Sequence, residues 1–174
     1  MGSNLSIPET AYSMPSSITV DFSSLESIKA LIEANPDFIR KQDQYGRLLF
    51  HLACGNRNSS LEVICFLYQA YTGAIYVGDR DGNIPLHYAC ITGHSLDMIK
   101  TLHEYYPGAV YVKDIYGKLA LHHASSSSSE KVIKILKLNY PEAVNVEDKY
   151  GKRPLYYEAK RHMNNKEGFI PTLR

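Results

Sequence analysis

Histidine and cysteine are the residues in this chain whose chemistry could support catalysis or metal binding, and their spacing decides which use fits. Histidine occurs seven times and cysteine three times. Histidine ligand pairs on a helix are usually four residues apart, which puts them on one face. His122 and His123 are adjacent and diverge, so they make a poor ligand pair. The chain also has no Cys-x-x-Cys pair, glycine-rich phosphate loop or nucleophile elbow. We therefore expect a protein that is not an enzyme and that uses no metal or cofactor.

Three of the histidines occupy one position in a motif that occurs four times. The motif begins with an aspartate and has a glycine three residues later. Phenylalanine or leucine stands seven residues after the aspartate, at the position called plus seven. Its copies begin at Asp43, Asp79, Asp114 and Asp148. His51, His87 and His122 stand at plus eight, where the last copy has Tyr156. A period in the mid-thirties predicts stacked supersecondary units, and these histidines recur at one position of that unit.

A second pattern fills the chain between the motifs. An isoleucine and a leucine three residues apart precede each aspartate at constant distances: Ile28 and Leu31, Ile64 and Leu67, Ile99 and Leu102, and Ile133 and Leu136. This spacing puts both side chains on one helix face. Ser-x-x-Glu sequences at Ser23, Ser59 and Ser127 have the capping-box spacing, and Gly93-His94-Ser95 stands in place of the box in the remaining unit. Helix starts are therefore predicted near residues 24, 60, 95 and 129. Prolines then end most of these helices, and short extended segments such as Ala109-Val110 are expected to lead to the next aspartate.

The block Gly82-Asn-Ile-Pro-Leu-His-Tyr-Ala89, followed by Gly93-His94 and an apolar helix, resembles the ankyrin repeat. The resemblance covers residues from about 23 to 161. The chain departs from the family's pattern because the usual threonine before proline is replaced by Leu48, Ile84, Leu119 and Arg153. The resemblance implies an all-α solenoid of ankyrin-type helix-turn-helix units with hairpin-like turns. It also implies that the motif histidines bridge backbone groups of neighbouring turns.

These patterns divide the chain into a tail, a repeat domain and an extension. Residues 1–22 are rich in serine and proline and are expected to form a disordered tail. The repeat domain is expected at 23–161 and the C-terminal extension at 162–174. The expected units are a half repeat at 23–42, repeats at 43–78, 79–113 and 114–147, and a capping repeat at 148–161. Tyr156 and Glu158 replace the usual histidine and alanine in this last unit, which favours a polar cap.

The first six residues fit the pattern for N-myristoylation of Gly2. A Met-Gly-Ser start is also a common by-product of cloning. A single lipid chain binds a membrane only marginally, and no polybasic run follows it here. We therefore expect an unmodified tail and keep lipidation of Gly2 as the alternative.

Composition narrows the compartment and the kind of partner. The 174 residues carry a net charge of +1, which gives no global reason to expect nucleic acid as a partner. No apolar stretch is long enough to span a bilayer. Three cysteines without a framework spacing favour the cytoplasm or nucleus. Cys54 and Cys90 follow the repeated alanine and are expected in the core, whereas Cys65 aligns with lysines and is expected to face solvent.

The resemblance implies that a partner protein binds to the turn tips and to the exposed face of the first helices. Carried over by position, the candidate partner-binding residues are Tyr45, Arg47, Arg80, Asp81, Tyr88, Tyr116, Lys118, His123, Tyr150 and Lys152. Tyrosine and arginine often dominate binding energy. In three turns a tyrosine precedes the glycine and a basic residue follows it, which suits an acidic or phosphorylated segment. The alternative is that these tyrosines pack turn against turn while the basic side chains are solvated.

The function expected from the sequence is that of a non-catalytic, monomeric adaptor or scaffold that recognises another protein. The alternative is a regulatory subunit that its tail, perhaps lipidated at Gly2, tethers to a larger complex. Nucleic-acid binding by the tyrosine and lysine residues is a third class, which the near-neutral net charge disfavours.

Overall fold

The computed structural model describes residues 20–167, and the side chains up to residue 164. Gly2 and nearly all of the expected tail therefore lie outside the described residues. The described chain contains eight α-helices and four short 3-10 turns, and no strand. In order, the elements are α1 (Leu25–Ala34), η2 (Pro36–Ile39), α2 (Leu49–Cys54), α3 (Leu61–Ala70), η3 (Thr72–Tyr76), α4 (Pro85–Thr92), α5 (Leu96–Tyr105), η4 (Pro107–Tyr111), α6 (Ala120–Ser127), α7 (Glu130–Asn139), η5 (Pro141–Asn145) and α8 (Pro154–Glu167).

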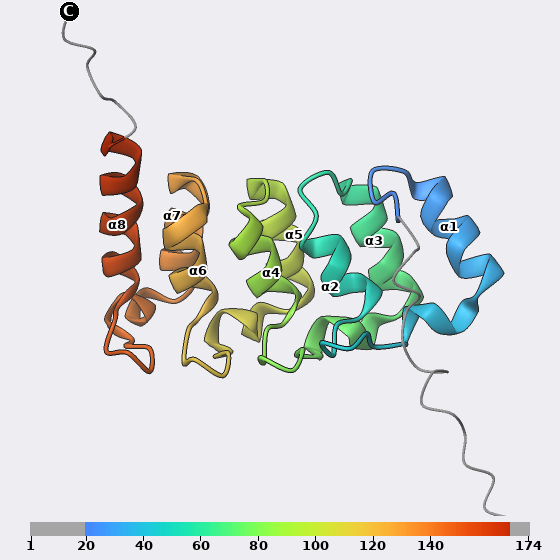
Figure 1. Ribbon diagram of the computed structural model, residues 1–174, viewed down its shortest axis with the longest axis horizontal. Coiled ribbons are helices and arrows are strands. Elements are labelled where there is room, and N and C mark those ends of the chain that lie inside the picture. Colours follow the sequence, from blue (N-terminus) through green and yellow to red (C-terminus); the bar gives the residue numbers. More distant parts are fainter. Residues whose placement is uncertain (1–19, 168–174) are drawn as a thin grey trace, which may run out of the picture.

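The helix pairs stand side by side in an elongated row that is two helices deep (Figure 1). The first helices of successive units pack on one another, α2 on α4, α4 on α6 and α6 on α8. Each of α2, α4 and α6 also packs on the second helix of its own unit, α3, α5 and α7 respectively. The turns before the first helices all project to one edge of the row, at the bottom of Figure 1. The expected all-α solenoid of helix-turn-helix units is confirmed.

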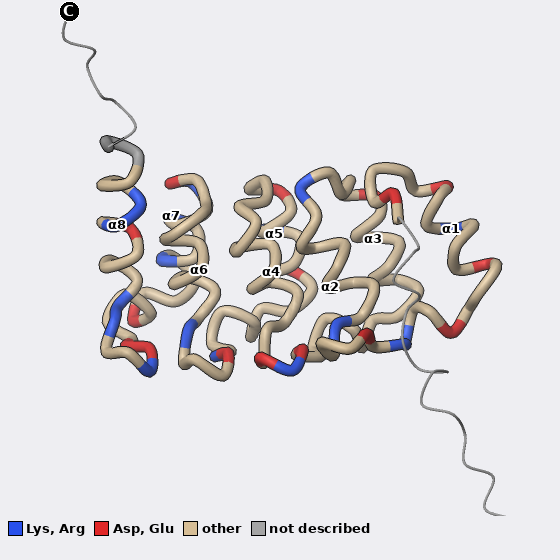
Figure 2. The backbone as a smooth tube through the Cα atoms, viewed as in Figure 1, with Lys and Arg blue, Asp and Glu red and all other residues tan. Residues whose placement is uncertain are grey.

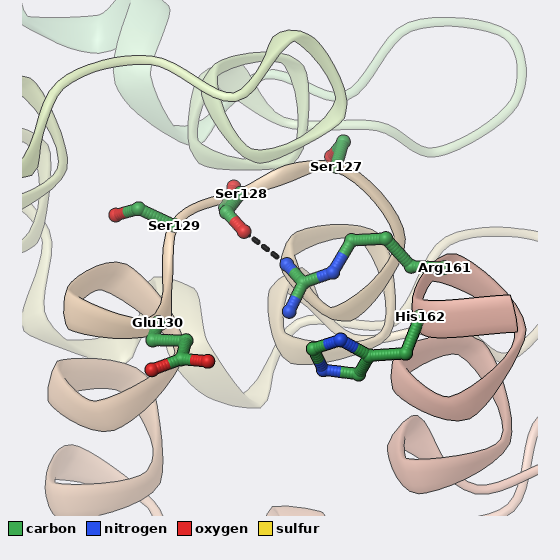
Figure 3. Close-up of a pocket in the computed structure, with 6 residues that line it drawn as sticks. All are labelled: Ser127, Ser128, Ser129, Glu130, Arg161 and His162. Atoms are coloured by element: carbon green, nitrogen blue, oxygen red, sulfur yellow. Dashed lines mark hydrogen bonds between the residues drawn. The ribbon is translucent and has the colours of Figure 1, made fainter. Parts of the chain in front are cut away.

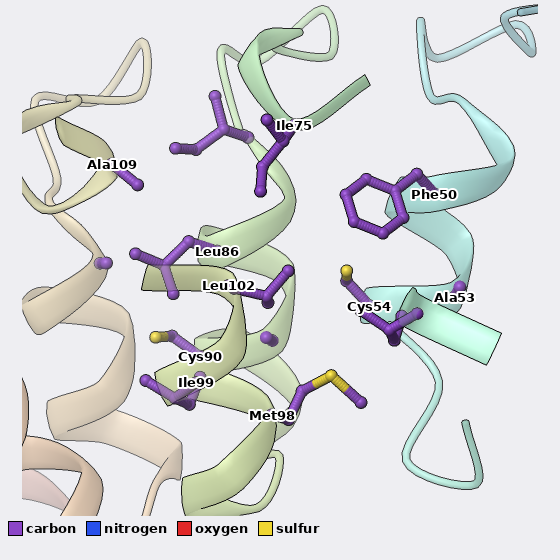
Figure 4. Packing of buried hydrophobic residues seen from close by; sticks show 14 of the residues in the cluster. Phe50, Ala53, Cys54, Ile75, Leu86, Cys90, Met98, Ile99, Leu102 and Ala109 are labelled. Atoms are coloured by element: carbon purple, nitrogen blue, oxygen red, sulfur yellow. The ribbon is translucent and has the colours of Figure 1, made fainter. Parts of the chain in front are cut away.

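The core runs along the row between the two layers of helices. The leucines of the second-helix stripe are buried, with Leu67, Leu102 and Leu136 at 0%, 1% and 2% exposure. The plus-seven side chains of the first helices, such as Leu86, face this stripe across the unit (Figure 4). Burial of each leucine or isoleucine contributes about 1.5–3 kcal/mol before conformational entropy is subtracted. The predicted helix face is confirmed.

The serine caps lie one or two residues later than the sequence pattern suggested. The hydroxyls of Ser24, Ser60, Ser95 and Ser129 accept the backbone N–H three residues on, at 3.2–3.4 Å. The predicted helix starts are correct, but the predicted capping boxes at Ser23, Ser59 and Ser127 are wrong. A cap must be the last extended residue before the helix. The acidic residue then falls in the first helical turn, where the helix dipole favours a negative charge.

The segments after the second helices were expected to be extended, and this prediction is wrong. They form the 3-10 turns η2 to η5, three of which begin with a proline. Proline fixes φ near a helical value and needs no N–H donor at this position. In η4 the N–H of Ala109 donates to the carbonyl of Tyr106, and the N–H of Val112 donates to that of Ala109. The backbone is extended only afterwards, at Val77, Val112 and Val146.

Each turn closes with the same hydrogen bonds. The N–H of the aspartate donates to the carbonyl four residues on, as Asp43 does to Arg47 at 2.9 Å. The intervening glycine has a positive φ, between 68° and 79° in the four turns, which glycine adopts at little cost. The last turn leads into α8, which continues past residue 161 to Glu167.

Candidate functional site

The motif histidines are buried and join consecutive units. The Nδ1 of His87 accepts the N–H of Ile84 at 3.1 Å, and its Nε2 donates to the carbonyl of Val112, in the next unit, at 3.1 Å. His51 and His122 make the equivalent pair of hydrogen bonds. Burial lowers the pKa of all three and brings that of His87 to about 4. These histidines therefore act as neutral bridges between turns, as the resemblance implied.

The motif aspartates organise the turns through both carboxylate oxygens. Oδ1 accepts the N–H groups two and four residues on, as Asp148 does from Tyr150 and Lys152, both at 2.9 Å. Oδ2 is held by a different side chain in each unit. The pairs are Asp43 with Arg47 at 2.6 Å, Asp79 with Tyr88 at 2.6 Å, Asp114 with His123 at 2.9 Å, and Asp148 with Tyr157 at 2.5 Å. We call these four pairs the aspartate clasps.

The clasps give a structural role to several of the candidate binding residues. Tyr88 and His123 stand nine residues after their aspartates, and each commits a polar atom to the turn of its own unit. Leu52 stands at this position in the first full unit, and Arg47 holds the aspartate there instead. Burial alone would raise the pKa of Asp114, but hydrogen bonds from His123 and from the turn amides hold it below its usual value. In the sequence, this arrangement is indicated by a hydrogen-bond donor side chain nine residues after the aspartate. In the first full unit, where leucine stands there, it is indicated by an arginine four residues after the aspartate.

The tip tyrosines are exposed and follow one another along the lower edge of the row. Tyr45, Tyr116 and Tyr150 are 55%, 40% and 63% exposed. The rings of Tyr116 and Tyr150 lie nearly parallel, with centroids 6.5 Å apart. Backbone hydrogen bonds tie successive tips together, from Arg80 N–H to Tyr45 O at 2.9 Å and from Lys149 N–H to Tyr116 O at 2.8 Å. Arg80 and Asp81 are also exposed at a tip.

The basic residues after the glycines differ in their surroundings. Arg47 is paired with Asp43 and lies over the ring of Tyr45, 4.8 Å from its centroid. Lys118 and Lys152 each lie 4.7 Å from a ring centroid, of Tyr157 and Tyr156 respectively. Figure 2 shows acidic residues among the basic ones along the tips, so the edge is not uniformly cationic. The structure therefore places the ten candidate residues along one edge and the adjoining helix face.

A second row of tyrosines, which the sequence reasoning missed, lies on the 3-10 turns. Tyr76 and Tyr111 are each 58% exposed, and each contacts the tyrosine that directly follows the second helix of the next unit. The ring centroids of Tyr76 and Tyr106 are 4.7 Å apart, and those of Tyr111 and Tyr140 are 4.5 Å apart. The signal was available, because these tyrosines stand three and eight residues before the aspartates. It was overlooked because the segment was interpreted as extended.

A shallow hollow of about 390 Å³ lies between the loop that joins α6 to α7 and the helix α8. Ser127, Ser128, Ser129, Glu130, Arg161 and His162 line it (Figure 3). Arg161 donates a hydrogen bond to the carbonyl of Ser128, so its guanidinium holds the loop against the helix. No serine, histidine and carboxylate in the hollow are hydrogen-bonded to one another as a nucleophile and base would be. Across the described residues, no three His, Cys, Asp or Glu side chains gather as metal ligands do.

The cysteines are free in the described structure. Cys54 and Cys90 are fully buried in the core, as expected, and burial raises the pKa of both thiols. Cys65 was expected to face solvent but is only partly exposed. The hydroxyl of Tyr105, from the second helix of the next unit, lies 3.3 Å from its sulfur, and Tyr105 itself stacks on Tyr68.

Comparison with known protein families agrees with this architecture. A family profile of ankyrin repeats in three copies matches residues 17–114 and again residues 61–148. The chain belongs to the ankyrin-repeat family. Repeats of this family generally serve as protein-protein interaction modules and are typically not catalytic. No curated protein sequence is significantly similar to this ankyrin-repeat chain. None of its described helices has the length and apolar character that crossing a bilayer requires.

Proposed function

We propose that this ankyrin-repeat protein is a non-catalytic adaptor that binds an acidic or phosphorylated segment of another protein across its turn tips. The observation that carries the proposal is the stacked pair Tyr116 and Tyr150, which is exposed and flanked by lysines. Aromatic rings supply large contact area with a polar end, and lysines attract carboxylate or phosphate groups. Such a function belongs in the cytoplasm or nucleus, where the three free cysteines are stable.

The cationic part of this surface is its C-terminal half. Arg47 is neutralised by Asp43, and Arg80 has the exposed Asp81 beside it. In the last two turns, by contrast, the aspartates Asp114 and Asp148 are buried and satisfied by hydrogen bonds. Three lysines that follow them are exposed or partly exposed at the tips and are not paired there with an acidic residue in the described structure: Lys118, Lys149 and Lys152. An acidic segment would therefore contact the tips of these two turns.

The surface is rigid before a partner arrives. The aspartate clasps fix each turn on its own first helix, and the backbone hydrogen bonds between tips fix each turn on the next. Binding then immobilises few groups, so little conformational entropy is lost. Tyr88 and His123 contribute by holding the turns, and their rings line the adjoining helix face.

The test compares two sets of tyrosine substitutions, and every ring that they remove is at least 40% exposed. Tyr45, Tyr116 and Tyr150 are replaced by alanine in one variant, and Tyr76 and Tyr111 in the other. Proteins retained from an extract of the native cell by each variant are identified by mass spectrometry, with circular dichroism as the check on folding. We expect the tip variant to lose its partner and the other variant to keep it. Retention of the same partner by the tip variant, or unfolding of that variant, would overturn the proposal.

A further inference from the structure

The outer face of α8 is apolar and uncovered, although its equivalents in the other units are buried. Leu155 stands at plus seven, where Phe50, Leu86 and Leu121 are 1–2% exposed, yet Leu155 is 68% exposed. Tyr156 is 45% exposed where the three motif histidines are at most 1% exposed. Ala159 is exposed at the position of the buried Cys54 and Cys90, and Met163, four residues on, is 59% exposed. These four side chains form one stripe, which we call the α8 face.

The inner units show what normally covers such a face. In α4 it is covered by α5, the second helix of the same unit, and by α6, the first helix of the next. Within the described residues α8 has neither neighbour. The surface that completes α8 is therefore a second helix of the repeat type, running antiparallel to it and carrying an Ile-x-x-Leu stripe.

The opposite end of the row has the complementary gap. α1 is a second helix of the repeat type, with Ile28 and Leu31 at the stripe positions, but no first helix of its own unit precedes it in the described chain. Leu31 is partly exposed, whereas its equivalents are at most 2% exposed. Ser27 is exposed where Val63, Met98 and Val132 are buried. In Figure 1, α1 runs downward and α8 runs upward, which is the antiparallel relation of two helices within a unit.

Charge at the two ends is also complementary. Glu33 and Asp37 are exposed on α1 and η2, beside Glu26, which is paired with Lys29 at 3.0 Å, and Figure 2 shows this acidic end at the right of the row. On α8, Lys160 is exposed, whereas Glu158 is already paired with Lys137 at 3.1 Å. Two α8 faces would bring like charges together, whereas α8 and α1 bring opposite charges together.

From these features we propose that α8 of one copy packs against α1 of a second copy, so that the two half units form one complete repeat. The interface is heterologous, because different surfaces meet, and it adds copies in an open chain. It differs from the monomer expected from the sequence. It leaves the turn tips free and continues their edge from one copy to the next. The small polar Ser27 makes the α1 face less apolar than an inner one, so we expect association only at high protein concentration.

The first measurement is the molar mass of the full chain by light scattering as its concentration rises from about 10 µM to about 1 mM, the range in which small interfaces assemble. We expect the mass to rise above the 19.6 kDa of one chain without stopping at two. A mass that stays at one chain throughout overturns the proposal, and it leaves the tip-binding function untouched.

Two variants decide which surfaces meet. Leu155→Glu places a charge on the α8 face, and Ser27→Lys places a cation on the α1 surface that would meet Lys160 of α8. Both positions are exposed, so both variants are expected to fold. Each variant alone should remain a single chain, and an equimolar mixture should form a pair, because the intact α8 of one meets the intact α1 of the other. Ile91→Glu, at a 42% exposed site within the row, is the control and should associate as the unchanged chain does.

Other arrangements give different results. If α8 packed on α8 of the second copy, Ser27→Lys would still form pairs and the mixture would gain nothing. If residues of the same chain covered the α8 face, no variant would change the mass. Either result overturns the proposal.

Discussion

Ser125 is one of three described residues with a buried side-chain polar atom that has no hydrogen-bond partner. It occupies the position of Cys54 and Cys90, is fully buried, and has no hydrogen-bond partner for its hydroxyl. Cysteine at this position fills the same space in two other units and needs no hydrogen bond. An unsatisfied buried hydroxyl costs about 1–3 kcal/mol.

We therefore expect Ser125→Cys to raise the free energy of unfolding by about 1 kcal/mol, because it removes this buried hydroxyl. Urea denaturation followed by circular dichroism measures the change. Ser126→Cys, at an exposed neighbour, is the control and should change stability by less than about 0.5 kcal/mol. A loss of stability in Ser125→Cys would show that the hydroxyl is satisfied.

The bridging histidines predict how stability depends on pH. Their pKa values are lowered by burial, to about 4 for His87, against an ordinary value of 6.5. Between these pH values the unfolded chain binds more protons than the folded chain, so stability falls as pH falls. The contribution of the neutral histidines is complete above about pH 6.5 and is lost progressively toward pH 4.

Denaturation midpoints measured at pH 7.5, 6 and 5 should decrease in that order, with the helical signal retained at each pH before denaturant is added. His87→Gln should be less stable at pH 7.5 and should show a weaker pH dependence, because one titrating bridge is gone. His162→Gln, at an exposed site, should keep the full dependence. A midpoint that is constant over this range would contradict neutral, buried histidines.

At the scale of the element, each second helix packs on the core through its isoleucine and leucine stripe and is capped by one serine. Leu102 lies in the middle of the row, on α5, and is 1% exposed. Its removal leaves a cavity between helices that are fixed on both sides. Leu138, on α7, is a leucine of the same size that is 66% exposed.

Leu102→Ala should lower the free energy of unfolding by about 2–5 kcal/mol, because it removes buried apolar contacts and leaves a cavity. Leu138→Ala should change it by less than about 0.5 kcal/mol. Chemical denaturation of the two variants under the same conditions gives the comparison. A loss below about 1 kcal/mol in Leu102→Ala would show that the stripe does not hold the row together.

At the scale of the whole molecule, the row is a chain of nearest-neighbour interfaces, and its ends differ from its middle. In the middle, each first helix is covered by a second helix and by the next first helix. At the ends, α1 and α8 each lack part of this cover in the described chain. Equivalent helix faces are therefore buried in the middle of the row and exposed at its ends. This difference supports end-to-end association, while the tip edge runs unbroken along the molecule.

The sequence by itself determined the repeat, the two helix types, their starts and the buried stripe. It could do so because each repeated position has the same surroundings in every unit. Residues such as Leu67, Leu102 and Leu136 are therefore all buried in the same way, and their recurrence in the sequence shows it. The role of His51, His87 and His122 followed from the family resemblance for the same reason. Local details that depend on one residue, such as which serine caps a helix, were missed.

Only the tertiary structure decided which polar side chains are already committed and which surfaces remain free. Tyr88 and His123 looked like binding residues because they lie on the open helix face, but their polar atoms hold Asp79 and Asp114. The tyrosines of the pairs Tyr76–Tyr106 and Tyr111–Tyr140 stand at repeated positions of the sequence, but each pair joins two units, so its contact depends on how the units stack. The exposure of Leu155 likewise depends on what stands beyond it in space. A repeat motif specifies what each unit contributes, whereas contacts between units and the state of the ends depend on the assembled row.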